Sequence, residues 1–314
     1  MTRALPGDAL GRLAAEASVD VWSEETAPSP QELRQRTSAA QGIVCLLTDR
    51  IDSALLDASP GLRVISNVAV GYDNIDVAEA TRRRIPVGNT PGVLTETTAD
   101  LAFALILAVA RRVVEAERYV RDGRWLTWHP SLMLGTDVHG ATLGIVGMGK
   151  IGQAVARRAA GFGMRVLYAS RSDAAVELGE RVGLEQLLER ADFVSLHVPL
   201  TPETHHLIGE RELRGMKPSA FLINTARGSI VDQRALVWAL EQQWIAGAGL
   251  DVTETEPIAA DDALLRAPNV VILPHIGSAS RATRELMASM AVDNCIAGLR
   301  GERLPHCVNP EVYA

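Results

Sequence analysis

The segment Thr142–Gly152 constrains the fold more than any other part of the sequence. It reads TLGIVGMGKIG, so an apolar run leads directly into a G-x-G-x-x-G pattern, and a helical pattern follows. Gly147 permits a tight turn, Gly149 lets the backbone approach a pyrophosphate, and Gly152 lets the helix pack closely on the strand. The helix N-terminus adds N–H donors and partial positive charge. This order predicts a βαβ unit that binds a dinucleotide, the alternative being a glycine-rich turn in another α/β protein.

The end of the next predicted strand, residues 165–170, bears on which dinucleotide binds. An NAD-binding chain usually places an acidic residue there, about 20 residues past the loop, to bind the ribose 2′-hydroxyl. This chain has Ser170, Arg171 and Ser172, with no acid before Asp173. A hydroxyl beside a guanidinium suits a 2′-phosphate. The sequence therefore favours NADPH and leaves NADH open, and a solvated surface role for Arg171 is the alternative.

Short apolar runs alternate with helical patterns along the chain, which is typical of βαβ units and parallel sheets. The predicted strands are 19–23, 42–48, 63–69, 85–89, 165–170, 192–197, 219–226, 246–252 and 269–274. A long helix is predicted from Thr95 to Arg121, followed by an irregular segment at 124–140, and the final helix is predicted at 281–299. We expect an α/β protein with two Rossmann-like, doubly wound parallel-sheet domains.

Composition argues against several classes of protein. The 314 residues exceed one typical compact core, and a formal net charge of −7 offers no basic surface for nucleic acid. The most apolar stretch, Leu101–Ala110, is about half the length that spans a membrane, so a buried helix is predicted. Cys45, Cys295 and Cys307 are widely spaced. With no leader pattern, they predict reduced thiols in a cytoplasmic protein and no metal site.

Three polar segments stand at the ends of predicted strands: Ile223–Gly228, Gly249–Pro257 and Ile272–Ser278. Each contains one residue type that reduction of a keto acid requires. Arg227 can clamp a carboxylate with two hydrogen bonds, and His275 can donate a proton near neutral pH. Glu256 can stabilise the imidazolium of that histidine. Taken singly, each also has an ordinary structural explanation, as a surface charge or a structural histidine.

The order of these motifs resembles the D-isomer-specific 2-hydroxyacid dehydrogenase family, over nearly the whole chain. The motifs are the glycine pattern at 147–152, NTARG at 224–228, DVTETEP at 251–257, PHIGS at 274–278, VAVGYDNID at 68–76 and NTP at 89–91. The resemblance implies that Arg227, Glu256 and His275 are the catalytic residues. It also implies that Val70 and Gly71, together with Arg227 and His275, bind the substrate.

The resemblance further implies a set of cofactor-binding residues. These are Gly147, Gly149, Lys150, Ile151, Gly152, Ser170, Arg171, Ser172, Val198, Pro199, Thr204, Thr225, Ala226, Arg227, Asp251, His275, Gly277 and Ser278. Asp251 matches the position that binds the nicotinamide amide, and its alternative role is to cap a strand-to-loop turn.

The resemblance also implies the domain organisation. Residues 1–97 and 281–314 would form a discontinuous, flavodoxin-like substrate-binding domain, and 98–280 an inserted NAD(P)-binding domain. The helix and arm at 95–140 would form a homodimer, with Trp125 and Trp128 either packing at the interface or contacting substrate, and packing is favoured.

Within the family, the segments 90–100, 135–139 and 204–207 most resemble the bacterial glyoxylate/hydroxypyruvate reductase branch. This implies NADPH-dependent reduction of glyoxylate or hydroxypyruvate to glycolate or D-glycerate, with His275 as the proton donor. The expected partners are a small 2-keto acid and a second copy of the chain, without nucleic acid or membrane. The alternatives are reduction of 2-ketogluconate or a D-lactate type of activity. A more remote one is a non-catalytic, nucleotide-sensing binder like the family's co-repressors.

Overall fold

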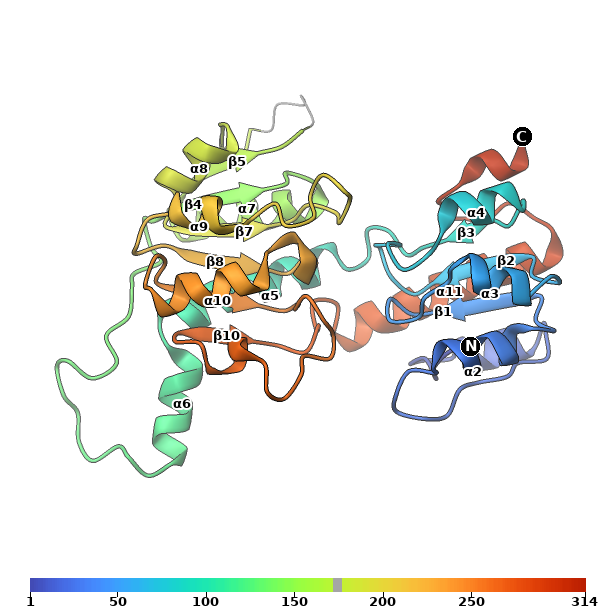
Figure 1. Ribbon diagram of the computed structural model, residues 1–314, viewed down its shortest axis with the longest axis horizontal. Coiled ribbons are helices and arrows are strands. Elements are labelled where there is room, and N and C mark those ends of the chain that lie inside the picture. Colours follow the sequence, from blue (N-terminus) through green and yellow to red (C-terminus); the bar gives the residue numbers. More distant parts are fainter. Residues whose placement is uncertain (172–176) are drawn as a thin grey trace. The chain divides into compact units, whose positions relative to one another are not determined.

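The computed structural model describes residues 1–171 and 177–314, and these fold into two compact units (Figure 1). Unit 1 comprises Met1–Leu94 and Ser278–Ala314, and unit 2 comprises Thr95–Gly277. Each unit has a parallel sheet covered by helices, so the predicted α/β class with two Rossmann-like sheets is confirmed. The assignment of substrate binding to one unit and cofactor binding to the other stays a prediction.

Unit 1 is built on a three-stranded parallel sheet in the order β1-β2-β3. The strands are β1 (Gly42–Cys45), β2 (Val64–Asn67) and β3 (Val87–Gly88), and the helices are α1 (Ala9–Ala14), α2 (Pro30–Thr37), α3 (Ser53–Ala58), α4 (Val77–Arg82), α11 (Arg281–Arg300) and the 3-10 turn η3 (Pro310–Tyr313). Ile43 and Ile65 face one apolar cluster, whereas Val44 and Val64 face a second cluster with α11. The strands are therefore apolar on both faces, as expected of a covered parallel sheet.

The predicted strand at 19–23 is wrong. Only single backbone hydrogen bonds join the neighbouring segments: the N–H of Trp22 donates to the carbonyl of Met1, and that of Thr2 to the carbonyl of Val44. The terminal ammonium of Met1 donates to the carbonyl of Asp20 at 2.7 Å. Because the bond at Asp20 is made by the terminal ammonium and not by a neighbouring strand, a regular ladder does not form.

Unit 2 contains a seven-stranded parallel sheet in the order β10-β9-β8-β7-β4-β5-β6. The strands are β4 (Thr142–Val146), β5 (Arg165–Ala169), β6 (Glu180–Arg181), β7 (Phe193–Leu196), β8 (Phe221–Asn224), β9 (Gly247–Leu250) and β10 (Val270–Ile272). The helices are α5 (Thr95–Ala110), α6 (Val113–Arg121), α7 (Lys150–Gly161), α8 (Leu184–Arg190), α9 (Glu210–Arg214) and α10 (Gln233–Glu241), with 3-10 turns η1 (Gly228–Ile230) and η2 (Ala263–Arg266). The strand order reverses at β4, between β5 and β7, and such a switch point is where parallel sheets bind ligands.

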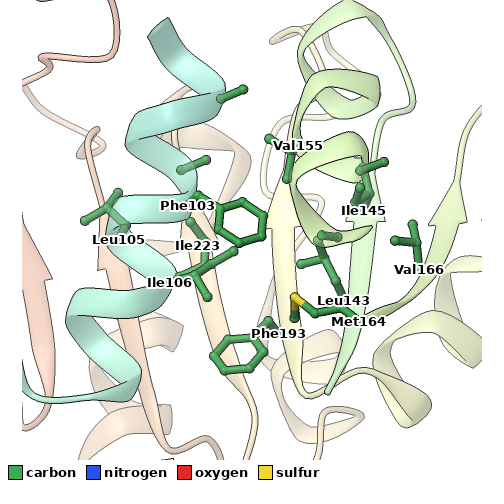
Figure 2. Packing of buried hydrophobic residues seen from close by; sticks show 14 of the residues in the cluster. Phe103, Leu105, Ile106, Leu143, Ile145, Val155, Met164, Val166, Phe193 and Ile223 are labelled. Atoms are coloured by element: carbon green, nitrogen blue, oxygen red, sulfur yellow. The ribbon is translucent and has the colours of Figure 1, made fainter. Parts of the chain in front are cut away.

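Helices α5 and α7 cover one face of the unit 2 sheet, and Figure 2 shows the core between them. Phe103 and Ile106 from α5 pack with Leu143 and Ile145 from β4, and all four side chains are buried. Phe193 on β7 belongs to the same cluster and stacks on the ring of Phe221. This packing fixes the central strands whose ends carry the site.

The single helix predicted from Thr95 to Arg121 is wrong, because the structure has two helices, α5 and α6. The break lies at Arg112, whose φ of 53° is left-handed. The returning chain causes it: the N–H of Thr136 donates to the carbonyl of Ala110 at 2.8 Å, and Gly135 lies against the same carbonyl. Figure 1 shows α6 and the segment after it reaching away from the unit 2 sheet.

Among the described helices, none combines the length and apolarity that crossing a membrane requires.

Candidate active site

The glycine loop joins β4 to α7 with little space for side chains. Gly147 has a φ of 99°, and a Cβ atom at Gly152 would lie only 2.2 Å from the carbonyl oxygen of Gly147. Gly149 stands just before α7, and a Cβ atom there would meet nothing within 4 Å. The turn and the helix packing therefore need glycine, and the backbone at Gly149 is open to a ligand.

A cavity of about 870 Å³ lies at this loop and at the ends of β5 and β7. It brings together seven of the predicted cofactor-binding residues: Gly147, Gly149, Ser170, Arg171, Val198, Pro199 and Thr204. Its volume is in the range of small-molecule sites. The predicted residue Ser172 lies outside the described residues.

Two further charged residues line the same cavity, Arg181 and Glu203, and neither was among the predicted cofactor-binding residues. A guanidinium nitrogen of Arg181 donates to the carbonyl of Ser170 at 3.0 Å. A hydrogen bond from Thr201 is the main cause that lowers the pKa of Glu203, and the nearby charge of Arg171 lowers it further. The cavity wall beside Ser170 thus carries two cations and one carboxylate. No motif marks Arg181 or Glu203, because only the fold brings them to this wall.

His197 also lines this cavity, at the end of β7. Its Nε2 atom lies 2.8 Å from Oγ of Ser195. Burial of the ring lowers the pKa of His197 to about 4, so the ring is neutral at physiological pH. No sequence motif marks this residue, apart from its place before Val198.

The loop after β8 carries Arg227. The side-chain amide of Asn224 closes this loop, since its Nδ2 donates to the carbonyl of Arg227 at 2.8 Å and its Oδ1 accepts from the N–H of Ala226. A Cβ atom at Gly228 would lie 1.9 Å from the carbonyl oxygen of Thr253. The loop that follows β8 is therefore in backbone contact with the loop that follows β9.

His275 follows β10 and pairs with Glu256 from the loop after β9. The Nδ1 atom of His275 lies 2.7 Å from Oε2 of Glu256, and the two side chains are 22% and 28% exposed. The other carboxylate oxygen of Glu256 accepts from the N–H of Thr253 at 3.2 Å. An ionised carboxylate only accepts hydrogen bonds, so Nδ1 carries the proton in this pair. The Nε2 atom is the ring nitrogen left for proton transfer.

Asp251 stands at the end of β9 and is buried. Its two carboxylate oxygens accept from the N–H groups of Ile276 and Gly277, each at 2.7 Å, and its carbonyl accepts from the N–H of His275. Burial raises the pKa of Asp251, although these N–H donors favour its charged form. The geometry is that of a cap on the turn after His275. Contact of Asp251 with a nicotinamide amide stays a prediction.

The remaining predicted residues do not line the cavity. Lys150, Ile151 and Gly152 lie in the first turn of α7, Thr225 and Ala226 lie directly after β8, Gly277 ends unit 2, and Ser278 begins the second segment of unit 1. The Oγ1 atom of Thr225 is buried and has no hydrogen-bond partner in the described parts of the chain. Buried hydroxyl groups are usually satisfied, so a bound ligand is a natural partner for it.

Val70 and Gly71 lie in unit 1, in the loop that follows β2, and both are half-buried. The structure therefore places the two predicted carboxylate donors in a different unit from Arg227, Glu256 and His275.

One group of side chains in the described ranges has the atoms that a metal ion needs. His205, His206 and Glu254 each offer one ligand atom, and these atoms lie within 4.8 Å of one another. The Nε2 atom of His206 is 2.8 Å from a carboxylate oxygen of Glu254. That contact accounts for two of the three groups without a metal, and two of the three residues are exposed.

Comparison with known proteins places this geometry in a family. Residues 103–277 match the family model described as "D-isomer specific 2-hydroxyacid dehydrogenase, NAD binding domain". A glyoxylate reductase of Korarchaeum cryptofilum is 58% identical over 99% of this chain and 96% of its own length. That relative is archaeal, whereas the segments 90–100, 135–139 and 204–207 predicted a bacterial branch.

Two solved structures resemble the whole chain. The TT0316 protein from Thermus thermophilus has a TM-score of 0.93 and 52% identity, covering 98% of both chains. An NADPH-dependent glyoxylate/hydroxypyruvate reductase from Sinorhizobium meliloti has a TM-score of 0.84 and 35% identity, covering 99% of this chain and 96% of its own. With the family model matched over more than half of the sequence, this chain belongs to the D-isomer specific 2-hydroxyacid dehydrogenase family.

Proposed function

We propose that this protein reduces glyoxylate or hydroxypyruvate to the corresponding 2-hydroxy acid, glycolate or D-glycerate, with NADPH as the preferred cofactor. The observation that carries this proposal is the 2.7 Å pair between His275 and Glu256, on the same sheet as the glycine loop. The names of the relatives support the substrate class, since the 58%-identical protein is called a glyoxylate reductase.

The cavity at the glycine loop suits a dinucleotide. Gly147 and Gly149 would hold the pyrophosphate on backbone N–H groups at the start of α7. Ser170 and Arg171 would hold a 2′-phosphate, and the charge of Arg181 on the same wall supports the phosphorylated cofactor. The 35%-identical reductase named NADPH-dependent is consistent with that preference. When bound, NADPH supplies the hydride for the keto carbon.

The side chains of the chain itself would orient the keto acid and protonate it. Arg227 would clamp the substrate carboxylate together with the N–H groups of Val70 and Gly71. The Nε2 atom of His275 would deliver a proton to the keto oxygen as the hydride reaches the carbon, so the product is a neutral hydroxyl group. Glu256 would hold the ring and stabilise its charged form before transfer.

We also propose that two copies form a homodimer through α6 and the arm at 122–140. Its support is the exposure of large apolar side chains there, since Leu126 is 92% and Trp128 is 76% exposed. Large exposed apolar surfaces usually mark interaction sites.

The three free thiols, Cys45, Cys295 and Cys307, are consistent with a reducing cytoplasm as the compartment.

The first experiment is a set of initial-rate measurements. Oxidation of NADPH and of NADH is followed separately with glyoxylate, hydroxypyruvate, pyruvate and 2-ketogluconate. Faster turnover of NADPH with glyoxylate or hydroxypyruvate is the expected result. Preference for pyruvate or 2-ketogluconate would overturn the substrate assignment, and equal use of NADH would overturn the cofactor preference. Cofactor binding without turnover of any of the four acids would favour a nucleotide-sensing binder instead.

A further inference from the structure

Three successive carbonyl groups in the loop after β2 are held by the body of unit 1. The carbonyl of Ala69 accepts from the N–H of Thr90 at 2.9 Å. The carbonyl of Val70 accepts from Nδ2 of Asn89 at 2.8 Å, and the carbonyl of Gly71 accepts from Nδ2 of Asn67 at 2.9 Å. Two asparagine side chains therefore fix the orientation of the peptide groups in this loop.

Fixing the carbonyls also fixes the N–H groups. In a trans peptide, the C=O of one residue and the N–H of the next point in opposite directions. Within the described ranges, the only cis peptide is the one between Glu256 and Pro257. The N–H of Val70 therefore points away from the N–H of Thr90 that holds its peptide. In the same way, the N–H of Gly71 points away from the Asn89 amide, and the N–H of Tyr72 points away from the Asn67 amide. These three N–H groups have no protein acceptor in the described parts of the chain.

Both polar side-chain atoms of Asn67 are hydrogen-bonded. Its side chain is fully buried, its Nδ2 also donates to Oδ1 of Asn74 at 3.2 Å, and its Oδ1 accepts from the thiol of Cys45. Asn74 in turn donates to the carbonyls of Leu46 and Asp49, at 3.0 and 2.9 Å. The Asn67 amide can therefore not turn over without breaking several buried hydrogen bonds.

The backbone of Asn89 is held by two hydrogen bonds. Its carbonyl accepts from Nδ2 of Asn294 on α11 at 3.0 Å, and its N–H donates to the carbonyl of His306 at 3.2 Å. Asn294 is fully buried, and its Oδ1 accepts from the N–H of His306. Asn89, whose side chain donates to the carbonyl of Val70, is thus tied to the long helix α11 of unit 1.

We propose that Asn67 and Asn89 are positioning residues for the substrate carboxylate, and that Tyr72 adds a third backbone N–H donor to those of Val70 and Gly71. This rests on the proposed function, in which Val70 and Gly71 meet the acid. Successive N–H groups on one loop form an anion-binding surface, and donors that are oriented in advance need no reorganisation when the anion arrives.

The test uses oxamate, a carboxylate close to glyoxylate in size whose amide carbon is not readily reduced. Oxamate is added to the isotope-labelled, NADPH-bound protein, and backbone amide resonances are followed by NMR. We expect shifts at Val70, Gly71 and Tyr72. Oxamate binding without a shift at these three amides would overturn the proposal. Detection of the loop amides does not depend on turnover, so it separates this proposal from the proposed function.

The variants Asn89→Ala and Asn89→Asp remove the donor to Val70, and the second keeps the size of the side chain. Each should weaken oxamate binding and raise KM for glyoxylate by about tenfold, with little change in NADPH affinity, because one oriented hydrogen bond is lost. Asn67→Ala should act in the same direction.

The matched control is Asn309→Ala. Asn309 is also fully buried in unit 1. Its side chain bonds Thr81, the carbonyl of Ile85 and the N–H of Val87 on β3, but none of the peptide groups of the loop after β2. It should lower stability and leave oxamate affinity unchanged. Equal oxamate affinity in the Asn89 variants and this control would overturn the positioning role. Oxamate binding at the three amides in a protein that reduces none of the keto acids would leave the carboxylate site standing and remove the proposed function alone.

Discussion

The imidazole of His275 and the carboxylate of Glu256 meet at 2.7 Å although they come from the ends of two different strands, β10 and β9. The backbone at His275 is left-handed, with a φ of 54°. The N–H of His275 donates to the carbonyl of Asp251, and the next N–H donates to the carboxylate of Asp251. This conformation is uncommon for a residue other than glycine. Its presence indicates that the position of the imidazole ring is maintained at the cost of backbone strain.

His275→Asn tests the proton donor. Asparagine tolerates the left-handed backbone, so the fold should be kept while the acid is lost. We expect kcat to fall about a hundredfold or more, since general acid catalysis contributes on that order, while the dissociation constant for NADPH changes little. Steady-state kinetics and fluorescence titration measure the two quantities. Arg84→Asn, at a left-handed position in unit 1, is the control. Unchanged kcat in His275→Asn would remove the histidine from this role.

Glu256→Gln tests the group that holds His275. The amide oxygen can still accept from Nδ1, but the negative charge that stabilises the imidazolium is gone. A fall in kcat of roughly tenfold or more is expected, smaller than that of His275→Asn. Glu254→Gln is the matched control, because Glu254 lies in the same loop and pairs with His206 at 2.8 Å. Similar kcat values for both variants would show that the negative charge at position 256 does not assist proton transfer by His275.

Arg171→Ala tests the cofactor preference. Loss of a charge-assisted bond to a 2′-phosphate should weaken NADPH binding on the order of tenfold to a hundredfold and leave NADH nearly unaffected. Glu203→Gln should act in the opposite direction, because the carboxylate of Glu203 lines the same cavity and would repel the phosphate. Both are measured by titration with each nucleotide. Equal losses for NADPH and NADH in Arg171→Ala would exclude a role in reading the phosphate.

The buried ring of His197 should lower the free energy of unfolding of the protein in mild acid. Burial lowers the pKa of its ring from 6.5 to about 4, so the unfolded chain takes up a proton before the folded one as the pH falls. Stability is therefore lost between these two values, by on the order of 3 kcal/mol for this group. His197→Asn should lose less over that window in urea unfolding, and the exposed His129→Asn should behave like the unchanged protein. A parallel decline in all three proteins would contradict the assignment.

The arm predicts the oligomeric state. Leu126→Glu puts a charge on a side chain that is 92% exposed, and burying that charge at an interface would be costly. We expect the unchanged protein to be a dimer by light scattering and the variant to shift toward the monomer. Leu10→Glu, at an exposed position on α1, serves as the control. A monomeric unchanged protein would remove the homodimer from the proposal.

The sequence predicted those parts of the fold that short-range rules decide. The turn at Gly147 and the packing at Gly152 depend on residues close in the chain, and β4, the loop and α7 were found in the predicted order. The ends of α5 and α6 were missed because the break at Arg112 depends on Thr136, which returns from a distant part of the arm. No glycine or proline marks it.

The candidate site was predictable to the same extent. His275 and Glu256 could be proposed because each follows a strand in a recognisable motif. Arg181 and Glu203 could not, because they reach the cavity wall only through the fold. The asparagine contacts to the loop after β2 were missed for a related reason: Asn89 and Val70 are adjacent only after β3 has folded beside β2.

The close approach of Gly228 to the carbonyl of Thr253 leaves no room for a side chain at position 228. Any residue larger than glycine at position 228 would push apart the loops that carry Arg227 and Glu256, so one shared backbone contact holds both loops in place. A substitution at position 228 would therefore disturb the proposed carboxylate clamp and the partner of His275 at the same time.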